Sequence, residues 1–296
     1  MKWRCEWGMV CDRGVRRAEN QDAALVWTSG HSIYLPNPEQ SQTNTGDSFV
    51  IFDHIPGEVC RPSLFALVAD GMGGGPAGAT ASRLIIETAI TTAEKEKISD
   101  SKKFFRVLID ACDKTIFQNA LTNNLAGMGS TCTALVLTKI QSHLCHIGDS
   151  RCYRISASAS KLRQWTSDHN LAAQLVRDGA IAAGEAATHP SSRILTQAVG
   201  LGKSLAPQVE GSPVADSGEA FLICSDGLIR TLEDREILAA ITPYLGAGST
   251  NQIKGSEAGD KNQMQLAAEQ LLALATERGA PDNVTVILIN LTRSMK

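Results

Sequence analysis

Residues 131–155, TCTALVLTKIQSHLCHIGDSRCYRI, decide the fold class of this 296-residue chain. They contain three short apolar runs, Thr131–Thr138, His143–Ile147 and Arg151–Ile155, separated by a few polar residues that favour turns. A parallel pair of strands needs a crossover of about a dozen residues or more, and none fits between these runs. We therefore expect consecutive antiparallel strands and an α+β fold rather than alternating βα units.

The remaining strands and helices are predicted in blocks on both sides of this stretch. Short apolar runs predict strands at Ser48–Asp53, Leu64–Ala69, Ala220–Cys224 and Val284–Leu291. Apolar residues at helical spacing predict helices at Ala77–Lys97, Phe104–Leu121, Asn170–Asp178, Asp234–Ile241 and Gln263–Arg278.

Two polar stretches, Ser29–Asp47 and Gly246–Lys261, are rich in Gly, Ser, Asn and Asp. Such composition predicts surface loops. With no internal repeat and no linker, residues 1–296 are expected to form a single domain with these two insertions.

The composition excludes several classes of protein. With 28 Lys plus Arg against 31 Asp plus Glu, the net charge is −3, which argues against a nucleic-acid binder. No apolar run approaches the roughly 18 residues that cross a bilayer, and the first residues lack the apolar core of a signal peptide. We expect a cytoplasmic protein without membrane contact.

Eight cysteines are scattered without the C-x-x-C pairs that usually mark structural zinc sites. Several lie in apolar runs, as Cys132 and Cys224 do. They are interpreted as buried, reduced thiols, which is usual in the cytoplasm.

Aspartates recur where the predicted strands end or begin. Asp70, Asp149 and Asp226 follow strands, whereas Asp282 and Asp22 precede them. An aspartate beside a glycine can be a simple turn residue. Strand ends of one layer, however, could bring several carboxylates into one pocket, where they would repel each other without a cation. Mg²⁺ and Mn²⁺ prefer such oxygen ligands.

Two other motifs would indicate a different kind of functional site. Residues 73–78, GGGPAG, match a dinucleotide-binding loop, but the acids that should end a second strand, Glu94 and Glu96, lie in a helical pattern. Gly148-Asp149-Ser150 resembles an esterase nucleophile block but has no D-x-x-H pair after it.

Histidine and cysteine motifs are also weak. His143 and His146 are three positions apart on a predicted strand, so they point to opposite faces and do not pair on a metal. Cys11 and Arg17 have the spacing of cysteine-dependent phosphatases, but no phosphate loop leading into a helix surrounds them.

Eight segments follow one another along the chain: R17-AENQD-22, V68-ADGMGG-74, G129-STCTAL-135, I147-GDSR-151, W165-TSDH-169, I194-LTQAVG-200, L222-ICSDGL-228 and D282-NVTV-286. Together, and in this order, they are similar to the metal-dependent protein phosphatase family (PPM, the type 2C serine/threonine phosphatases), and DGMGG resembles its bacterial branch. The resemblance implies a four-layer α-β-β-α sandwich with two central antiparallel sheets. It also implies a phosphoserine/phosphothreonine phosphatase that hydrolyses phosphate monoesters by direct attack of a metal-bridging water or hydroxide.

The resemblance implies a core metal site of two Mn²⁺ or Mg²⁺ ions. Asp70 corresponds to the carboxylate that bridges them, and the carbonyl of Gly71 joins one of them. Asp226 and Asp282 complete the other.

Three further positions carry implied roles. Asp22 corresponds to the acid that holds metal-bound water, and Asp149 with Asp226 matches the positions for a possible third, weaker ion. Arg17 corresponds to the arginine that holds the substrate phosphate.

The chain departs from some family members at two positions. Met72 stands where many eukaryotic members carry a histidine proposed as general acid, so no side-chain acid is assigned. Gln21 stands where some have a glutamate ligand. Residues 170–193 correspond to the variable flap, so substrate contacts are not transferred.

The implied partners are phosphoprotein substrates and a separate eukaryote-like Ser/Thr kinase, and a monomer is expected. Two alternatives stay open. A catalytically dead phosphoprotein-binding module would need a lost metal ligand, and Asp70, Asp149, Asp226 and Asp282 are all present. A hydrolase of small phosphate esters would share the same pocket.

Overall fold

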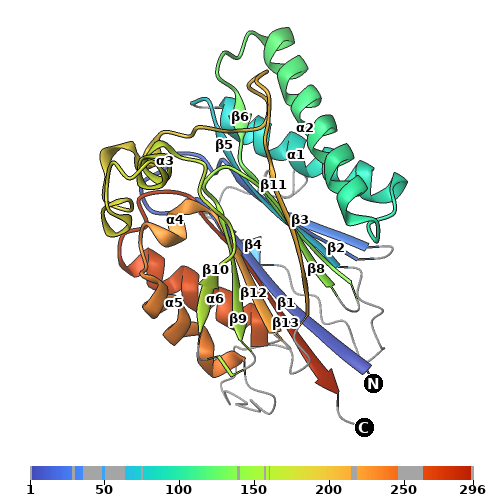
Figure 1. The fold of residues 1–296 in the computed structure, drawn as a ribbon, viewed down its shortest axis with the longest axis vertical. Helices are drawn as coiled ribbons and strands as arrows, with labels where there is room; N and C mark the ends of the chain where they lie inside the picture. Colours follow the sequence, from blue (N-terminus) through green and yellow to red (C-terminus); the bar gives the residue numbers. More distant parts are fainter. Residues whose placement is uncertain are drawn as a thin grey trace.

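Two antiparallel β-sheets packed face to face form the centre of the computed structural model, with helices on both outer faces (Figure 1). The structure describes residues 2–28, 31–35, 49–50, 64–74, 76–138, 141–156, 158–159, 161–214, 219–245 and 263–294. Both sheets and the helices that cover them lie within these ranges.

The first sheet has the strand order β10-β9-β12-β13-β1-β4. Its strands are β1 (Lys2–Asp12), β4 (Phe49–Val50), β9 (Arg151–Ser156), β10 (Leu162–Gln164), β12 (Glu219–Cys224) and β13 (Val284–Ser294). The two longest strands, β1 and β13, pair along their whole length at the centre.

The second sheet has the order β11-β8-β7-β5-β2-β3, and the short β6 (Gly129–Ser130) pairs with β5 outside this path. Its strands are β2 (Asp22–Thr28), β3 (His31–Leu35), β5 (Leu64–Met72), β7 (Cys132–Leu137), β8 (Gln141–Ile147) and β11 (Gln208–Pro213). Every described ladder in both sheets is antiparallel, so the antiparallel prediction is confirmed and the dinucleotide-binding alternative is wrong.

Three apolar layers hold the sandwich together. Alternate side chains of each strand point to opposite faces, so Ala24 and Val26 of β2 pack between the sheets while Ala23 and Leu25 face helices. On that side lie α1 (Pro76–Lys95) and α2 (Ser101–Asn123). On the far side α5 (Asp234–Ile241) and α6 (Gln263–Glu277) cover the first sheet. The α-β-β-α sandwich is therefore confirmed (Figure 1).

The segment Asn170–Arg193 lies between β10 and β11 and contains little regular structure. It holds α3 (Leu171–Arg177) and two 3₁₀ turns, Ala183–Glu185 and Pro190–Arg193. The expected helix at 170–178 is confirmed. The remaining short elements are α4 (Asp226–Ile229) and the 3₁₀ turn Thr242–Tyr244.

Some predictions of local structure are wrong or incomplete. The stretch Ser29–Asp47 was expected to be a loop, but His31–Leu35 forms β3 by pairing with β2. Ser48–Asp53 contributes only Phe49–Val50 as β4, and its other residues, like the stretch Gly246–Lys261, lie outside the described ranges. Within those ranges, no helix combines the length and apolarity that crossing a bilayer demands.

Candidate active site

Two of the predicted site residues are direct neighbours in the second sheet. Asp22 begins β2, Asp70 lies near the end of β5, and the two are partners in the antiparallel register. Antiparallel pairing places the start of one strand beside the end of the next, so both carboxylates emerge at the same end of the sandwich.

The other three aspartates reach the same end from connecting segments. Asp149 follows β8, Asp226 opens α4 directly after β12, and Asp282 lies two residues before β13. Since β12 pairs antiparallel with β13, the end of one meets the start of the other. The structure thus brings together all five aspartates that the sequence singled out.

The electrostatics of these carboxylates show how close they lie. Burial, followed by the charge of Asp226, raises the pKa of Asp149 to about 8. Burial also raises the pKa of Asp22 to about 7 and that of Asp226 to about 6, with neighbouring carboxylates adding to both shifts. The pKa of Asp70 is raised well above its ordinary value by burial and by the four other aspartates. The positive charge that the structure places beside the cluster, on Arg17 and Arg230, does not offset burial and the mutual repulsion of the carboxylates.

Hydroxyl groups fix the backbone and side chains of the central pair. The Asp70 amide donates to Thr131 Oγ1 at 2.9 Å, and the Asp70 carbonyl accepts from the Thr131 amide at 2.9 Å and from Ser130 Oγ at 3.0 Å. Thr285 Oγ1 donates to Asp22 Oδ2 at 2.7 Å. These bonds hold both carboxylates on rigid strands rather than on mobile loops.

Gly71 lies where β5 meets the start of α1 with no room for a side chain. A Cβ at this position would be 1.9 Å from the carbonyl oxygen of Gly78 in α1. The Gly71 amide donates to the Gln21 carbonyl at 3.0 Å. Gln21 packs its side chain against Gly78, where a Cβ would lie 2.8 Å from Gln21 Cδ.

Arg17 lies beside the cluster on the loop between β1 and β2. Its Nη2 donates to Asp282 Oδ2 at 2.6 Å, and its side chain stays 49% exposed. The hydrogen bond to Asp282 and the charges of Asp70 and Asp226 raise the pKa of Arg17. A half-exposed guanidinium beside this cluster is accessible to a phosphate.

Asn283 was not singled out from the sequence, yet it holds the loop that carries Arg17. Its Nδ2 donates to the carbonyls of Arg13 at 2.7 Å and Glu19 at 3.0 Å, and its Oδ1 accepts from the Gln21 amide at 2.9 Å. The sequence signal for this role was the position of Asn283 directly after Asp282, because an asparagine side chain can both donate and accept hydrogen bonds.

Two more arginines were missed as parts of the site. Arg230 Nη2 lies 2.5 Å from Asp226 Oδ2, and their separation of four residues along a helix was the available signal. Arg151 binds Asp168 through Nε and Nη2, with the latter 2.8 Å from Asp168 Oδ2. The second pair ties the loop of Asp149 to the base of the flap.

The donor set fits a hard divalent cation. The cluster offers carboxylate oxygens and no thiolate or imidazole, which suits Mg²⁺ or Mn²⁺ rather than zinc. Among the described residues, no group of three or more His, Cys, Asp or Glu side chains is placed to hold a metal ion as it stands. Arg17 and Arg230 pair with Asp282 and Asp226 instead.

The competing histidine and cysteine sites are not formed. His146 is fully buried and its Nδ1 hydrogen-bonds Thr133 Oγ1 at 2.9 Å, whereas His143 is partly exposed. Cys11 is buried, and burial raises the pKa of its thiol to about 12, which opposes a nucleophilic thiolate. The cysteines of the described ranges are all buried, as expected, and Cys60 lies outside those ranges.

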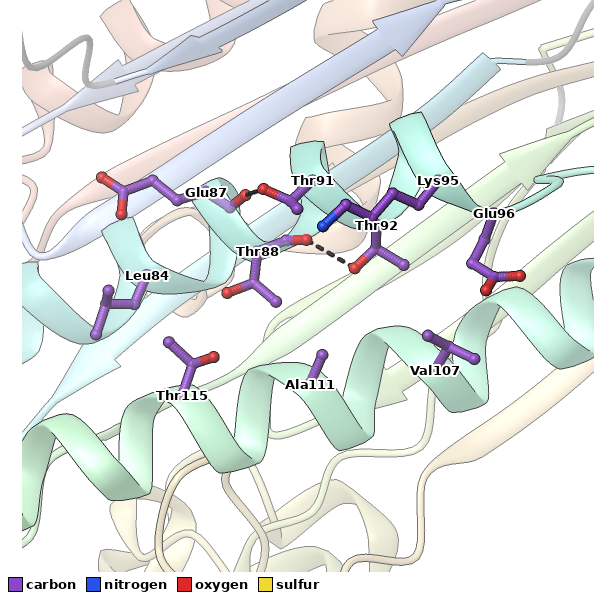
Figure 2. Close-up of a pocket in the computed structure, with 10 residues that line it drawn as sticks. All are labelled: Leu84, Glu87, Thr88, Thr91, Thr92, Lys95, Glu96, Val107, Ala111 and Thr115. Carbon is purple, nitrogen blue, oxygen red and sulfur yellow. Dashed lines mark hydrogen bonds between the residues drawn. The ribbon is translucent and has the colours of Figure 1, made fainter.

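A groove of about 430 Å³ lies away from these residues, between α1 and α2 (Figure 2). Its walls carry threonines and a few charged side chains, among them Thr88, Thr91, Lys95, Glu96 and Thr115. None of the five aspartates lines it, so it is not part of the candidate site.

Comparisons with known proteins agree with this geometry. The family profile described as Protein phosphatase 2C matches residues 41–271. The chain is 30% identical to the protein phosphatase PhpP of Streptococcus pneumoniae serotype 2 over 264 residues, 87% of this chain and 96% of PhpP.

Solved structures show the same fold. The serine/threonine phosphatase PstP/Ppp of Mycobacterium tuberculosis is similar with a TM-score of 0.71 and 27% identity, covering 99% of this chain and 100% of that one. A structure of the PstP catalytic domain in complex with 2 manganese ions has a TM-score of 0.71 and 26% identity, over 98% of this chain and 100% of that one.

Proposed function

The chain belongs to the protein phosphatase 2C family, and from this we propose that its five-aspartate cluster is the metal centre of a serine/threonine protein phosphatase. The substrates are phosphoserine and phosphothreonine side chains of proteins, and the cofactor is Mn²⁺ or Mg²⁺. The observation that carries the proposal is the meeting of Asp22, Asp70, Asp149, Asp226 and Asp282 at one end of the sandwich.

The core metal ligands are Asp70, the carbonyl of Gly71, Asp226 and Asp282. Bound there, a pair of divalent ions supplies Lewis-acid activation of water and charge neutralisation for the transferring phosphoryl group. Asp22, buried beside Asp70 and fixed by Thr285, orients the water that attacks phosphorus. No covalent bond to the enzyme is needed.

Arg17 binds the phosphate of the substrate. In the structure its guanidinium holds the carboxylate of Asp282, and the same fork of N–H donors suits two phosphate oxygens. With Asp282 engaged as a metal ligand, the Arg17 guanidinium would be free to bind the substrate phosphate instead. Its exposure on the loop pinned by Asn283 makes this exchange possible.

The leaving serine or threonine oxygen receives its proton from water. Met72 ends β5 beside the cluster and has no transferable proton, so it cannot protonate the leaving group.

Residues 1–296 act as one phosphatase domain, because the apolar layer between the sheets joins strands from both ends of the chain. The enzyme is a monomer that reverses the action of a separate eukaryote-like Ser/Thr kinase. Six buried thiols of the described ranges, Cys11, Cys112, Cys132, Cys145, Cys152 and Cys224, support a reducing compartment such as the cytoplasm.

The test is phosphate release from a phosphothreonine peptide with added Mn²⁺, compared with a phosphotyrosine peptide and a small sugar phosphate. We expect release from the phosphothreonine peptide only with metal, and much slower release from the other two. Equal or faster turnover of the sugar phosphate would favour the small-ester alternative. No metal-dependent release from any of them would favour a phosphoprotein-binding module.

A further inference from the structure

One guanidinium lies among three of the aspartates assigned to metal binding. Arg230 follows directly after α4, and its Nη2 lies 2.5 Å from Asp226 Oδ2 and 3.9 Å from Asp149 Oδ2. Its Nη1 lies 4.0 Å from Asp282 Oδ2. No other described cation is ion-paired to Asp149 or to Asp226.

The position of Arg230 is built into the local fold. Its amide donates to the Asp226 carbonyl at 2.9 Å, so the turn that presents the Asp226 carboxylate also presents the guanidinium four residues later. Its side chain is only 26% exposed, and those of Asp149 and Asp226 are 8% and 10% exposed. The contact is therefore shielded from solvent and salt more than a surface ion pair.

The positive charge of Arg230 lies beside the same carboxylates, Asp149 and Asp226, that would bind a third cation. It lowers the pKa of both Asp149 and Asp226 against the effect of burial. A guanidinium has no lone pair to offer a metal, and its positive charge repels an arriving divalent ion at this distance. Because Arg230 is covalently attached, it competes without the entropic cost of capturing a free ion.

We propose that Arg230 is the built-in counter-ion of the Asp149–Asp226 pair and takes the place of a third divalent ion. The chain then holds two ions at its core site and excludes a further one. This inference rests on the proposed function, since it assumes that Asp226 belongs to a metal centre. It makes Arg230 a residue that determines metal stoichiometry rather than a catalytic residue.

The test is a Mn²⁺ titration followed by calorimetry and by the electron paramagnetic resonance signal of free Mn²⁺, both independent of catalysis. Wild type is expected to bind two ions. Arg230→Gln is expected to bind one ion more, or to bind Mn²⁺ at the Asp149–Asp226 pair at least tenfold more tightly. Arg230→Lys, which keeps the charge, should bind as wild type does.

Two controls locate the effect. Arg235→Gln removes a nearby, 80% exposed arginine that pairs with Glu233, and should leave the titration unchanged. The double variant Arg230→Gln/Asp149→Ala should lose the additional ion again. Circular dichroism verifies folding, and Arg230→Met, which keeps the aliphatic stem, replaces the glutamine variant if the latter is unfolded.

The possible results separate this inference from the proposed function. Unchanged or weaker Mn²⁺ binding by Arg230→Gln, with two ions in wild type, would overturn the role of Arg230 and leave the metal centre intact. An additional ion that persists without Asp149 would overturn its location. Wild type that binds no Mn²⁺ would overturn both this inference and the metal centre.

Discussion

Asp22 and Asp70 face each other across β2 and β5 as direct partners in the antiparallel register. Residues in this relationship have Cβ atoms about 4.5–5.5 Å apart, so two carboxylates are held close together by the sheet itself. Asp22 is 1% exposed, and the charges on its neighbours add to the burial that raises its pKa. The folded chain therefore carries electrostatic strain that bound cations would relieve.

This strain predicts a pH-dependent stability of the metal-free protein. A carboxyl group whose pKa is raised by folding stabilises the fold while it is protonated, and that contribution is lost as pH rises through the folded-state pKa. With the pKa of Asp22 at about 7 and that of Asp149 at about 8, stability should fall between pH 6.5 and 8.5. In excess chelator we expect a melting temperature lower by about 5 °C at the higher pH.

The chosen window lies above most of the titration of the two buried histidines, His146 and His169, whose pKa values are both lowered by burial. Burial lowers the pKa of His146 to about 3. The contribution of this neutral histidine to stability is therefore lost as the pH falls below about 6.5 and is nearly constant above it. Asp149→Asn should reduce the fall, and saturating Mn²⁺ should abolish it. A metal-free protein whose melting temperature rises from pH 6.5 to 8.5 would contradict the electrostatic account.

Arg17→Ala tests the phosphate contact. Loss of a charge-assisted contact should raise KM for a phosphothreonine peptide without changing Mn²⁺ stoichiometry. The fall in kcat/KM should correspond to a loss of transition-state stabilisation on the order of 2–3 kcal/mol. Arg16→Ala, an exposed neighbour on the same loop, is the matched control and should behave as wild type. If Arg17→Ala keeps both kinetic constants, Arg17 is only a surface ion-pair partner of Asp282.

Much of the fold could be predicted because its strands and helices carry clear periodicity. The segment 234–241 is a helix with the expected bounds, and β12 and β13 begin within one residue of the predicted runs. β1 was missed because Lys2, Arg4 and Glu6 interrupt its apolar residues. Its alternation of Cys5, Trp7, Met9 and Cys11, which pack between the sheets, was the available signal.

β3 and the arginine contacts were harder to predict. His31–Leu35 lies in a polar stretch and becomes a strand only through its pairing with β2, which is a tertiary effect. The five aspartates were found because each lies at a strand end. Arg230 was missed because its three partners come from separate segments, and only the pair with Asp226 is local.

The buried cysteines predict resistance to thiol reagents. Burial raises the pKa of Cys11 to about 12, and its sulfur accepts a hydrogen bond from Asn20 Nδ2 at 3.2 Å. N-ethylmaleimide should therefore leave more than half of the activity of the folded enzyme after an hour at pH 7. Rapid inactivation that follows modification of Cys11, identified by peptide mass spectrometry, would restore the cysteine-nucleophile alternative.

Asp70→Asn should remove the core metal site. Asp70 is assigned to bridge both ions, and its backbone is locked by Ser130 and Thr131, so no neighbouring group can move into its place. We expect loss of both tightly bound ions at micromolar Mn²⁺ and activity lower by at least about 10³, as when an activated water is lost. The fold should persist, because asparagine has nearly the same volume and relieves the repulsion with Asp22.

Asp149→Ala should behave differently, because Asp149 lies beside Arg230 and is not among the residues assigned to the core ions. The core ligands assigned above, Asp70, Asp226 and Asp282, are unchanged in this variant, so two tightly bound ions should remain in calorimetry. If Arg230 takes the place of a third ion, activity on phosphopeptides should fall by no more than about tenfold, because neither an assigned core ligand nor the assigned phosphate contact is lost. A fall of about 10³ with both ions retained would mean that Asp149 acts in turnover, through a third ion that Arg230 does not exclude. Loss of the tight pair in Asp149→Ala, with the pair retained in Asp70→Asn, would instead reverse the roles assigned to the two aspartates.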